Sequence, residues 1–215
     1  MRKLYAGAAA LSFSVVADST MEHYRGGFYN PMMYVGPTVA ALTLGGALQG
    51  FRKPRATRGR AGVFAAAVAA GFVGTGFHAY NILRREGGLS LQNLFYAAPL
   101  AAPFGITAAG LFGLAGGRLA DQDSSGRLPR FGWMAAGPLL AGGAAVGLVG
   151  TAAEAALLHF RGAFHNPYLY LPVTIPPLAA AATGAALLDP TRVRIGMAGT
   201  LLWSTVALGW PARWC

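Results

Sequence analysis

The chain has 215 residues, of which 54% are hydrophobic and only 11% charged, with a formal net charge of +10. An ordinary soluble domain carries about 25% charged residues, so this composition argues against a water-soluble globular protein and favours a membrane protein. The single cysteine, Cys215, excludes a disulfide framework, a cysteine-ligated zinc site and c-type haem attachment within one chain.

Apolar stretches that reach or approach the roughly 20 residues of a membrane-spanning helix recur along the chain. In chain order they cover residues 3–24, 31–51, 61–83, 93–117, 131–158, 167–188 and, more briefly, 195–210. The pattern predicts an all-α, polytopic transmembrane helix bundle that forms a single membrane domain over residues 1–215. Its expected parts are three repeated two-helix units, at about 3–52, 61–118 and 131–189, and a seventh C-terminal span at about 195–211.

The 17 basic residues fall in alternate loops of this arrangement, twelve on one side and five on the other. The richer side holds Arg2, Lys3, Arg52, Lys53, Arg55, Arg58, Arg60, Arg118, Arg127, Arg130, Arg192 and Arg194; the poorer side holds Arg25, Arg84, Arg85, Arg161 and Arg213. Cytoplasmic loops carry the excess of Lys and Arg, so the N-terminus is expected in the cytoplasm. The excess of Ala, Gly and Arg is typical of a GC-rich bacterial genome, which indicates the bacterial cytoplasmic (inner) membrane.

A polar motif occurs twice. Residues 23–34 read HYRGGFYNPMMY and residues 159–170 read HFRGAFHNPYLY, with seven identities in twelve positions at an offset of 136. A weaker third copy lies between them, where FVGTGFHAYNILRREGG parallels LVGTAAEAALLHFRGA and NLFYAAP echoes NPMMYVGP. These loops are expected to face the periplasm.

Part of the motif has a structural explanation. Asparagine followed by proline is a helix N-cap followed by proline at the first helical position, glycine lets the chain leave the preceding helix, and tyrosine suits the membrane interface. The residues concerned are Asn30, Pro31, Asn166, Pro167, Gly26, Gly162, Tyr34 and Tyr170.

In every copy an ionisable residue stands seven positions before an arginine, which places the two on one helix face. The pairs are Asp18 with Arg25, His78 with Arg85, and Glu154 with Arg161, and Glu22 shares the first of these faces. Ionisable groups inside a membrane are costly and mark functional sites. If the three units surround a common axis, Asp18, Glu22, His78 and Glu154 would either hold a divalent metal or form a hydrated polar network.

All four histidines lie on the outer side, and His23 and His159 occupy equivalent positions. Two readings are open for this pair: joint ligation of a cofactor such as haem b, or hydrogen bonds to the outer loops. The outer arginines Arg25, Arg85 and Arg161 would bind carbonyls at helix ends, pair with the acids, or hold an anion such as a haem propionate, a quinone headgroup or a lipid phosphate.

The chain contains no P-loop, dinucleotide fingerprint, serine nucleophile elbow or HExxH motif. No catalytic residue is therefore assigned, and whether the protein is an enzyme stays open. No loop combines charge with stacking aromatics, which argues against nucleic acid.

Three functions stay open. The first is a membrane subunit of a redox or electron-transfer assembly, facing the periplasm and binding haem, metal or quinone near the outer leaflet or docking a catalytic protein partner. The second is a proton- or cation-coupled transporter or channel that uses Asp18, Glu22, His78 and Glu154. Helices interrupted by proline also favour a transporter. The third is a membrane enzyme acting on a lipid or quinone.

Overall fold

A computed structural model describes residues 1–97, 99–100, 102–123, 130–131 and 133–208. Arg127, Arg213, Cys215 and the end of the predicted seventh span, residues 209–211, lie outside the described residues. The regular secondary structure of the described residues is helical apart from one antiparallel pair of two-residue strands, β1 (Arg130–Phe131) and β2 (Met134–Ala135). The helices are α1 (Arg2–Arg25), η1 (Pro31–Tyr34), α2 (Val35–Arg52), α3 (Arg58–Leu83), α4 (Leu91–Tyr96), α5 (Phe104–Asp123), α6 (Ala136–Arg161), η2 (Pro167–Tyr170), α7 (Leu171–Leu188) and α8 (Arg192–Leu208).

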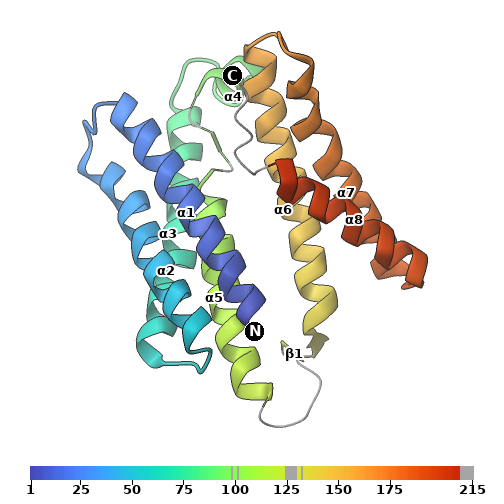
Figure 1. The fold of residues 1–215 in the computed structure, drawn as a ribbon. Helices are drawn as coiled ribbons and strands as arrows, with labels where there is room; N and C mark the ends of the chain where they lie inside the picture. The colour runs from blue at the N-terminus through green and yellow to red at the C-terminus, as the bar shows by residue number, and fades with distance from the viewer. Residues whose placement is uncertain (98, 101, 124–129, 132, 209–215) are drawn as a thin grey trace. The chain divides into compact units, whose positions relative to one another are not determined.

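The chain divides into two compact units, Met1–Pro129 (unit 1) and Arg130–Cys215 (unit 2). Unit 1 contains α1 to α5, and unit 2 contains β1, β2 and α6 to α8 (Figure 1). The prediction of one membrane domain over the whole chain stays a prediction.

Small residues let the helices of unit 1 pack closely. Helix α1 packs against α2 and α5, and α3 packs against α5 and α2. One buried cluster joins Tyr5 and Phe64 with alanines, and a second is built around Ile106. A Cβ atom at Gly50 would lie 2.3 Å from the Tyr5 ring, and one at Gly113 would lie 2.4 Å from the Phe64 ring. Glycine at these positions therefore permits two aromatic rings to enter the core.

Unit 2 is a helical hairpin with one additional helix. Helix α6 packs against α7, and α7 packs against α8. The buried side chains are small, among them Ala152, Ala179 and Thr183. Pro176 and Pro177 lie inside α7, where each removes a backbone donor from the helix.

Four helical segments among the described residues are long and apolar enough to cross a membrane: Pro31–Arg52, Arg58–Leu83, Ala136–Arg161 and Pro167–Leu188. Large apolar side chains on these segments are exposed, including Phe72, Val146 and Leu178, as expected for residues that face lipid. The chain is thus all-helical in character and suited to a bilayer. Helix α1 is long enough at 24 residues, but its last two turns carry Asp18, Glu22 and His23.

The predicted span 93–117 differs from the observed structure. Residues 91–96 form the separate short helix α4, and α5 begins only at Phe104. The link between α3 and α5 is therefore longer than the connectors that join α1 to α2 and α6 to α7.

Candidate functional site

The first copy of the polar motif forms a tight connector between α1 and α2. The helix closes with two capping hydrogen bonds, from the Phe28 amide to the His23 carbonyl at 3.0 Å and from the Gly27 amide to the Tyr24 carbonyl at 2.9 Å. This pairing is typical of a helix end whose next residue adopts the left-handed conformation, and Gly27 has φ 71°. The Asn30 side chain then accepts a hydrogen bond from the Met32 amide at 3.0 Å, which caps η1.

The second copy repeats this geometry at an offset of 136 residues. The Phe164 amide donates to the His159 carbonyl at 3.0 Å, and the Ala163 amide donates to the Phe160 carbonyl at 2.9 Å. The Asn166 side chain accepts from the Tyr168 amide at 3.0 Å. The predicted asparagine caps and the prolines that follow them are confirmed in both copies.

Gly26 and Gly162 are the C-cap residues of α1 and α6, where the chain is expected to leave each helix, but they are not the left-handed residues of these helix ends. Both have ordinary backbone angles, with φ of −79° and −83°. The left-handed positions are the next ones, Gly27 in the first copy and Ala163, with φ 55°, in the second. The Gly-to-Ala difference between the copies hid this position in the sequence comparison.

An aromatic stack fixes each connector. Phe28 stacks on Tyr34 with ring centres 4.3 Å apart, and Phe164 stacks on Tyr170 with ring centres 4.6 Å apart; the rings are inclined by 15° in both pairs. To make this contact Phe28 adopts φ 45° and Phe164 adopts φ 46°. A bulky residue in this conformation is a true outlier, which costs about 1–3 kcal/mol unless the surroundings enforce it.

His23 and His159 lie against these stacks. The His23 ring meets the edge of Phe28 with centres 6.0 Å apart, and the His159 ring meets Phe164 at 6.1 Å. Both histidines are half-buried. His23 Nδ1 is buried and has no hydrogen-bond partner among the described residues, so the ring is held by packing. The two histidines belong to different units, and joint ligation of a haem stays a prediction.

The outer arginines differ in their surroundings. Arg25 forms an exposed ion pair with Glu22, with 2.7 Å between Nη1 and Oε1, as their shared helix face predicts. Arg161 ends α6 at the equivalent position and is also engaged in an interaction. Arg85 lies beyond the end of α3, in the turn that follows Leu83. The prediction that His78 and Arg85 share a helix face is therefore wrong.

The acid and histidine set comes from three helices, α1 and α3 of unit 1 and α6 of unit 2. Asp18 and Glu22 are exposed on α1, and Glu154 lies on α6 in unit 2. His78 is half-buried, and its Nδ1 lies 2.6 Å from the Pro99 carbonyl oxygen, a contact that ties α3 to the following link. No group of three His, Cys, Asp or Glu side chains suited to a metal lies together in the described part of the chain. Because Glu154 belongs to the other unit, the four-residue metal set stays a prediction.

The link in the middle of the chain does not repeat the connector geometry. Here Ser90 is the N-cap, accepting from the Asn93 amide at 3.2 Å. Asn93 is buried inside α4, and its Nδ2 donates to the carbonyls of Glu86 and Gly88 at 2.9 and 2.8 Å. The similarity between the sequences NPMMYVGP and NLFYAAP therefore does not extend to the backbone conformation.

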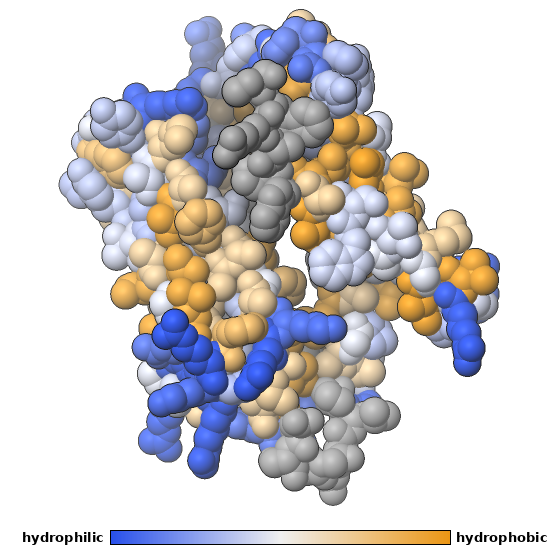
Figure 2. Space-filling model, in the orientation of Figure 1, coloured by the Kyte–Doolittle hydropathy of each residue, from blue (hydrophilic) through white to orange (hydrophobic). Residues whose placement is uncertain are grey.

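A polar cluster that the sequence did not predict lies at the opposite end of unit 1. Tyr5 is buried, and its hydroxyl donates to the Pro54 carbonyl at 3.2 Å. Arg60, only 8% exposed, donates from Nη1 to the Lys53 carbonyl at 2.7 Å and from Nη2 to the Arg55 carbonyl, and its guanidinium lies 5.7 Å from the Tyr5 ring centre. Hydrophilic side chains gather around this end, where α2 ends and α3 begins (Figure 2).

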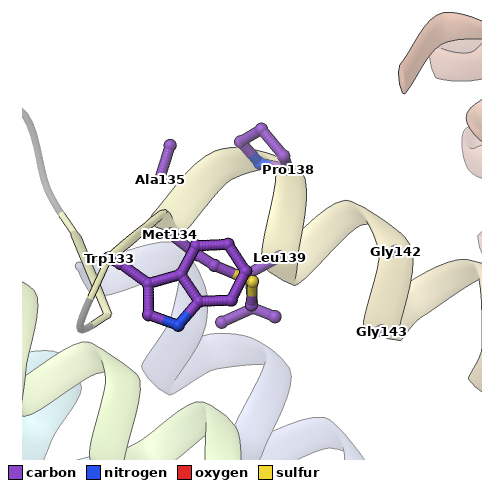
Figure 3. A pocket seen from close by; sticks show the side chains of 7 residues that line it. All are labelled: Trp133, Met134, Ala135, Pro138, Leu139, Gly142 and Gly143. Atoms are coloured by element: carbon purple, nitrogen blue, oxygen red, sulfur yellow. The ribbon is translucent and has the colours of Figure 1, made fainter. Parts of the chain in front are cut away.

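Unit 2 has an open recess of about 540 Å³ beside the start of α6. Its lining is formed by Trp133, Met134, Ala135, Pro138, Leu139, Gly142 and Gly143, none of which is titratable (Figure 3). Apart from the Trp133 indole N–H, the described side chains of this lining offer mainly apolar contact.

No family model matches the chain, and neither the curated proteins nor the solved structures include a significant match. Its function must therefore be inferred from its own residues, and the two matched connectors are the feature that most needs an explanation.

Proposed function

We propose that the protein is an integral membrane subunit of a periplasm-facing redox or electron-transfer assembly, and that its two matched connectors dock a catalytic protein partner there. In the alternative version of this proposal, the protein itself binds haem, a metal or a quinone near the outer leaflet. The observation that carries the proposal is the duplicated connector with its strained phenylalanine. A connector that only had to turn the chain could use glycine at Phe28 and Phe164.

The connectors also present side chains that the turn itself does not need. Tyr24 and Tyr29 are 75% and 81% exposed on the first connector, and Phe160 and Tyr168 are 61% and 57% exposed on the second. Exposed aromatic residues beside an arginine are the residue types enriched in protein interfaces. The rigid stack beneath them would hold these groups in place before a partner binds, which reduces the entropy cost of association.

The cofactor version of the proposal assigns His23 and His159 as haem ligands, and Arg25, Arg85 and Arg161 as partners of anionic groups. The His23 Nδ1 is buried against protein, so a ligand would have to approach Nε2. The metal version assigns Asp18, Glu22, His78 and Glu154. Both versions require groups of unit 1 and unit 2 to act together.

The decisive experiment is purification from native membranes in a mild detergent. We expect a stoichiometric periplasmic partner that carries a redox cofactor, or a Soret band or bound metal in the protein itself. The double variant Arg25→Gln, Arg161→Gln should lose the partner. The matched control Arg84→Gln, which changes an exposed arginine on the same side, should keep it. A protein with no Soret band, no stoichiometric metal and no partner would contradict the proposal.

We also propose the finer architecture of three related two-helix units and seven spans in the bacterial inner membrane, with the N-terminus in the cytoplasm. The equal lengths of α2 and α7, 18 residues each, and the matched connectors before them support a relation between the first and third units. The distribution of charge supports the orientation. In unit 1 the basic-rich end carries Arg2, Lys3, Arg52, Lys53, Arg55, Arg58, Arg60 and Arg118, whereas the connector end carries Arg25, Arg84 and Arg85.

A further inference from the structure

A pocket opens at the basic end of unit 1, at the opposite end of α1 from the connector. It has a volume of about 280 Å³ and lies between the first turns of α1 and α3 and the last turns of α5. Its lining includes Tyr5, Arg60, Phe64, Leu114, Arg118 and Asp121. We infer that this pocket binds a phosphate group, the chemistry shared by an anionic phospholipid headgroup and free inorganic phosphate.

Two arginines line the pocket. Arg60 is more than nine-tenths buried, and its two terminal nitrogens are occupied by backbone carbonyls, but its Nε has no hydrogen-bond partner among the described residues. Arg118 is exposed and lines the pocket from α5. Arginine donors suit phosphate because the guanidinium forms charge-assisted hydrogen bonds in a fixed geometry.

The charges around the pocket favour an anion. Two arginines line it against one carboxylate, Asp121, and the N-terminus of α3, which favours negative charge, contributes Thr57 and Ala61 to the lining. Exposed Arg52, Lys53, Arg55 and Arg58 stand nearby on the α2–α3 turn and at the start of α3. An anion would therefore approach a positive surface and enter a pocket lined by two arginines.

The rest of the lining is apolar, with Phe64 and Leu114 next to the arginines. A pocket that combines basic and apolar walls at the cytoplasmic end of membrane helices suits a phospholipid headgroup. Free phosphate would use the arginines alone. The binding of a lipid here would join α1, α3 and α5 at the end where Arg60 already ties the α2–α3 turn together.

The test uses the full-length protein in detergent and native mass spectrometry with dioleoylphosphatidylglycerol or dioleoylphosphatidylcholine. We expect the anionic lipid to be retained in preference to the zwitterionic one. Arg118→Gln should weaken its retention about tenfold, the loss of one charge-assisted hydrogen bond. Arg58→Gln, which removes a neighbouring arginine outside the pocket lining, should change it by less than about twofold, as an exposed charge does.

Excess inorganic phosphate distinguishes the two sources of the ligand. Displacement of the lipid by phosphate would show that the phosphate group alone is sufficient, whereas retention of the lipid would show that the apolar wall contributes; both results support the site. Equal losses in Arg118→Gln and Arg58→Gln, or equal retention of the two lipids, would mean diffuse surface attraction and overturn the inference. The outcome of this lipid-binding test does not affect the proposed role of the connectors. That role is tested separately, by co-purification of a partner and by the absorption spectrum of the protein.

Discussion

At each connector one aromatic residue is held in the left-handed backbone region, and the residue before it occupies the same region. Gly27 and Phe28 do so in the first copy, and Ala163 and Phe164 in the second. The stack on Tyr34 or Tyr170 and the paired capping hydrogen bonds are the contacts that hold this backbone. The two copies thus differ at one left-handed position, which is Gly27 in the first and Ala163 in the second. The free-energy cost of placing alanine there can therefore be measured.

Ala163→Gly should stabilise the protein by about 0.5–1 kcal/mol, because glycine adopts a positive φ without the strain that Ala163 carries. The reciprocal change Gly27→Ala should destabilise it by about 1 kcal/mol. A Cβ at Gly27 would meet nothing within 4 Å, so only backbone strain is tested. Unfolding of the two variants in detergent, followed by circular dichroism, measures both values. Shifts of the same sign in the two variants would contradict the prediction.

Asn30→Ala and Asn166→Ala should each cost about 1 kcal/mol, the usual value of a lost N-cap. The two costs should be equal because each asparagine side chain accepts one backbone hydrogen bond of 3.0 Å. Asn81→Ala is the control, since Asn81 is exposed within α3 and alanine has the higher helix propensity there. A loss in Asn81→Ala as large as in the other two would show that the caps have no special role.

At the scale of helices, close approach depends on individual glycines. Gly50 of α2 faces the Tyr5 ring of α1, and Gly71 of α3 faces Thr107 and the Pro103 carbonyl beside α5. Gly45, on the same helix as Gly50, faces open space. The small-residue runs in the sequence therefore contain two kinds of glycine, those that admit a neighbouring helix and those that do not.

Gly50→Ala should destabilise the protein by about 1–3 kcal/mol, the usual cost of overpacking. The added Cβ would lie 2.3–2.7 Å from three atoms of the buried Tyr5 ring, whose hydroxyl is fixed on Pro54. Gly45→Ala should be neutral or stabilising by up to about 1 kcal/mol, because alanine is the better helix former. Thermal unfolding of the two variants in the same detergent compares them, and a similar loss in both would refute the packing explanation.

The sequence predicted those helix ends that residue type determines locally. The asparagine–proline pairs gave the starts of η1 and η2. The link between α3 and α5 was not predictable in the same way, because Ser90 takes the capping role and Asn93 turns inward to bond two carbonyls. The Tyr5–Arg60 cluster was also missed, since its members lie on different helices and neither periodicity nor a motif connects them.

At the scale of the whole molecule, the sequence predicts a separation of charge, which depends only on counting basic residues along the chain. In unit 1 the predicted sides correspond to the two ends of the helices. The predicted convergence of Asp18, His78 and Glu154 required more, namely the placement of one unit against the other, which no local pattern specifies. The distribution of basic residues is therefore a firmer basis for predicting the orientation than the ionisable residues are for predicting a shared site.

The single cysteine makes the topology directly testable. With the N-terminus in the cytoplasm and seven spans, Cys215 should lie in the periplasm and react with a membrane-impermeant maleimide in intact cells. In a Cys215→Ser background, Tyr29→Cys on the first connector should react in the same way. Arg58→Cys on the basic end should react only after the membrane is permeabilised. Protection of Cys215 together with labelling of Tyr29→Cys would mean that residues 195–211 do not cross the membrane. The positive-inside rule places the basic-rich loops in the cytoplasm. Labelling of Arg58→Cys in intact cells would therefore show that the orientation is the reverse of the predicted one.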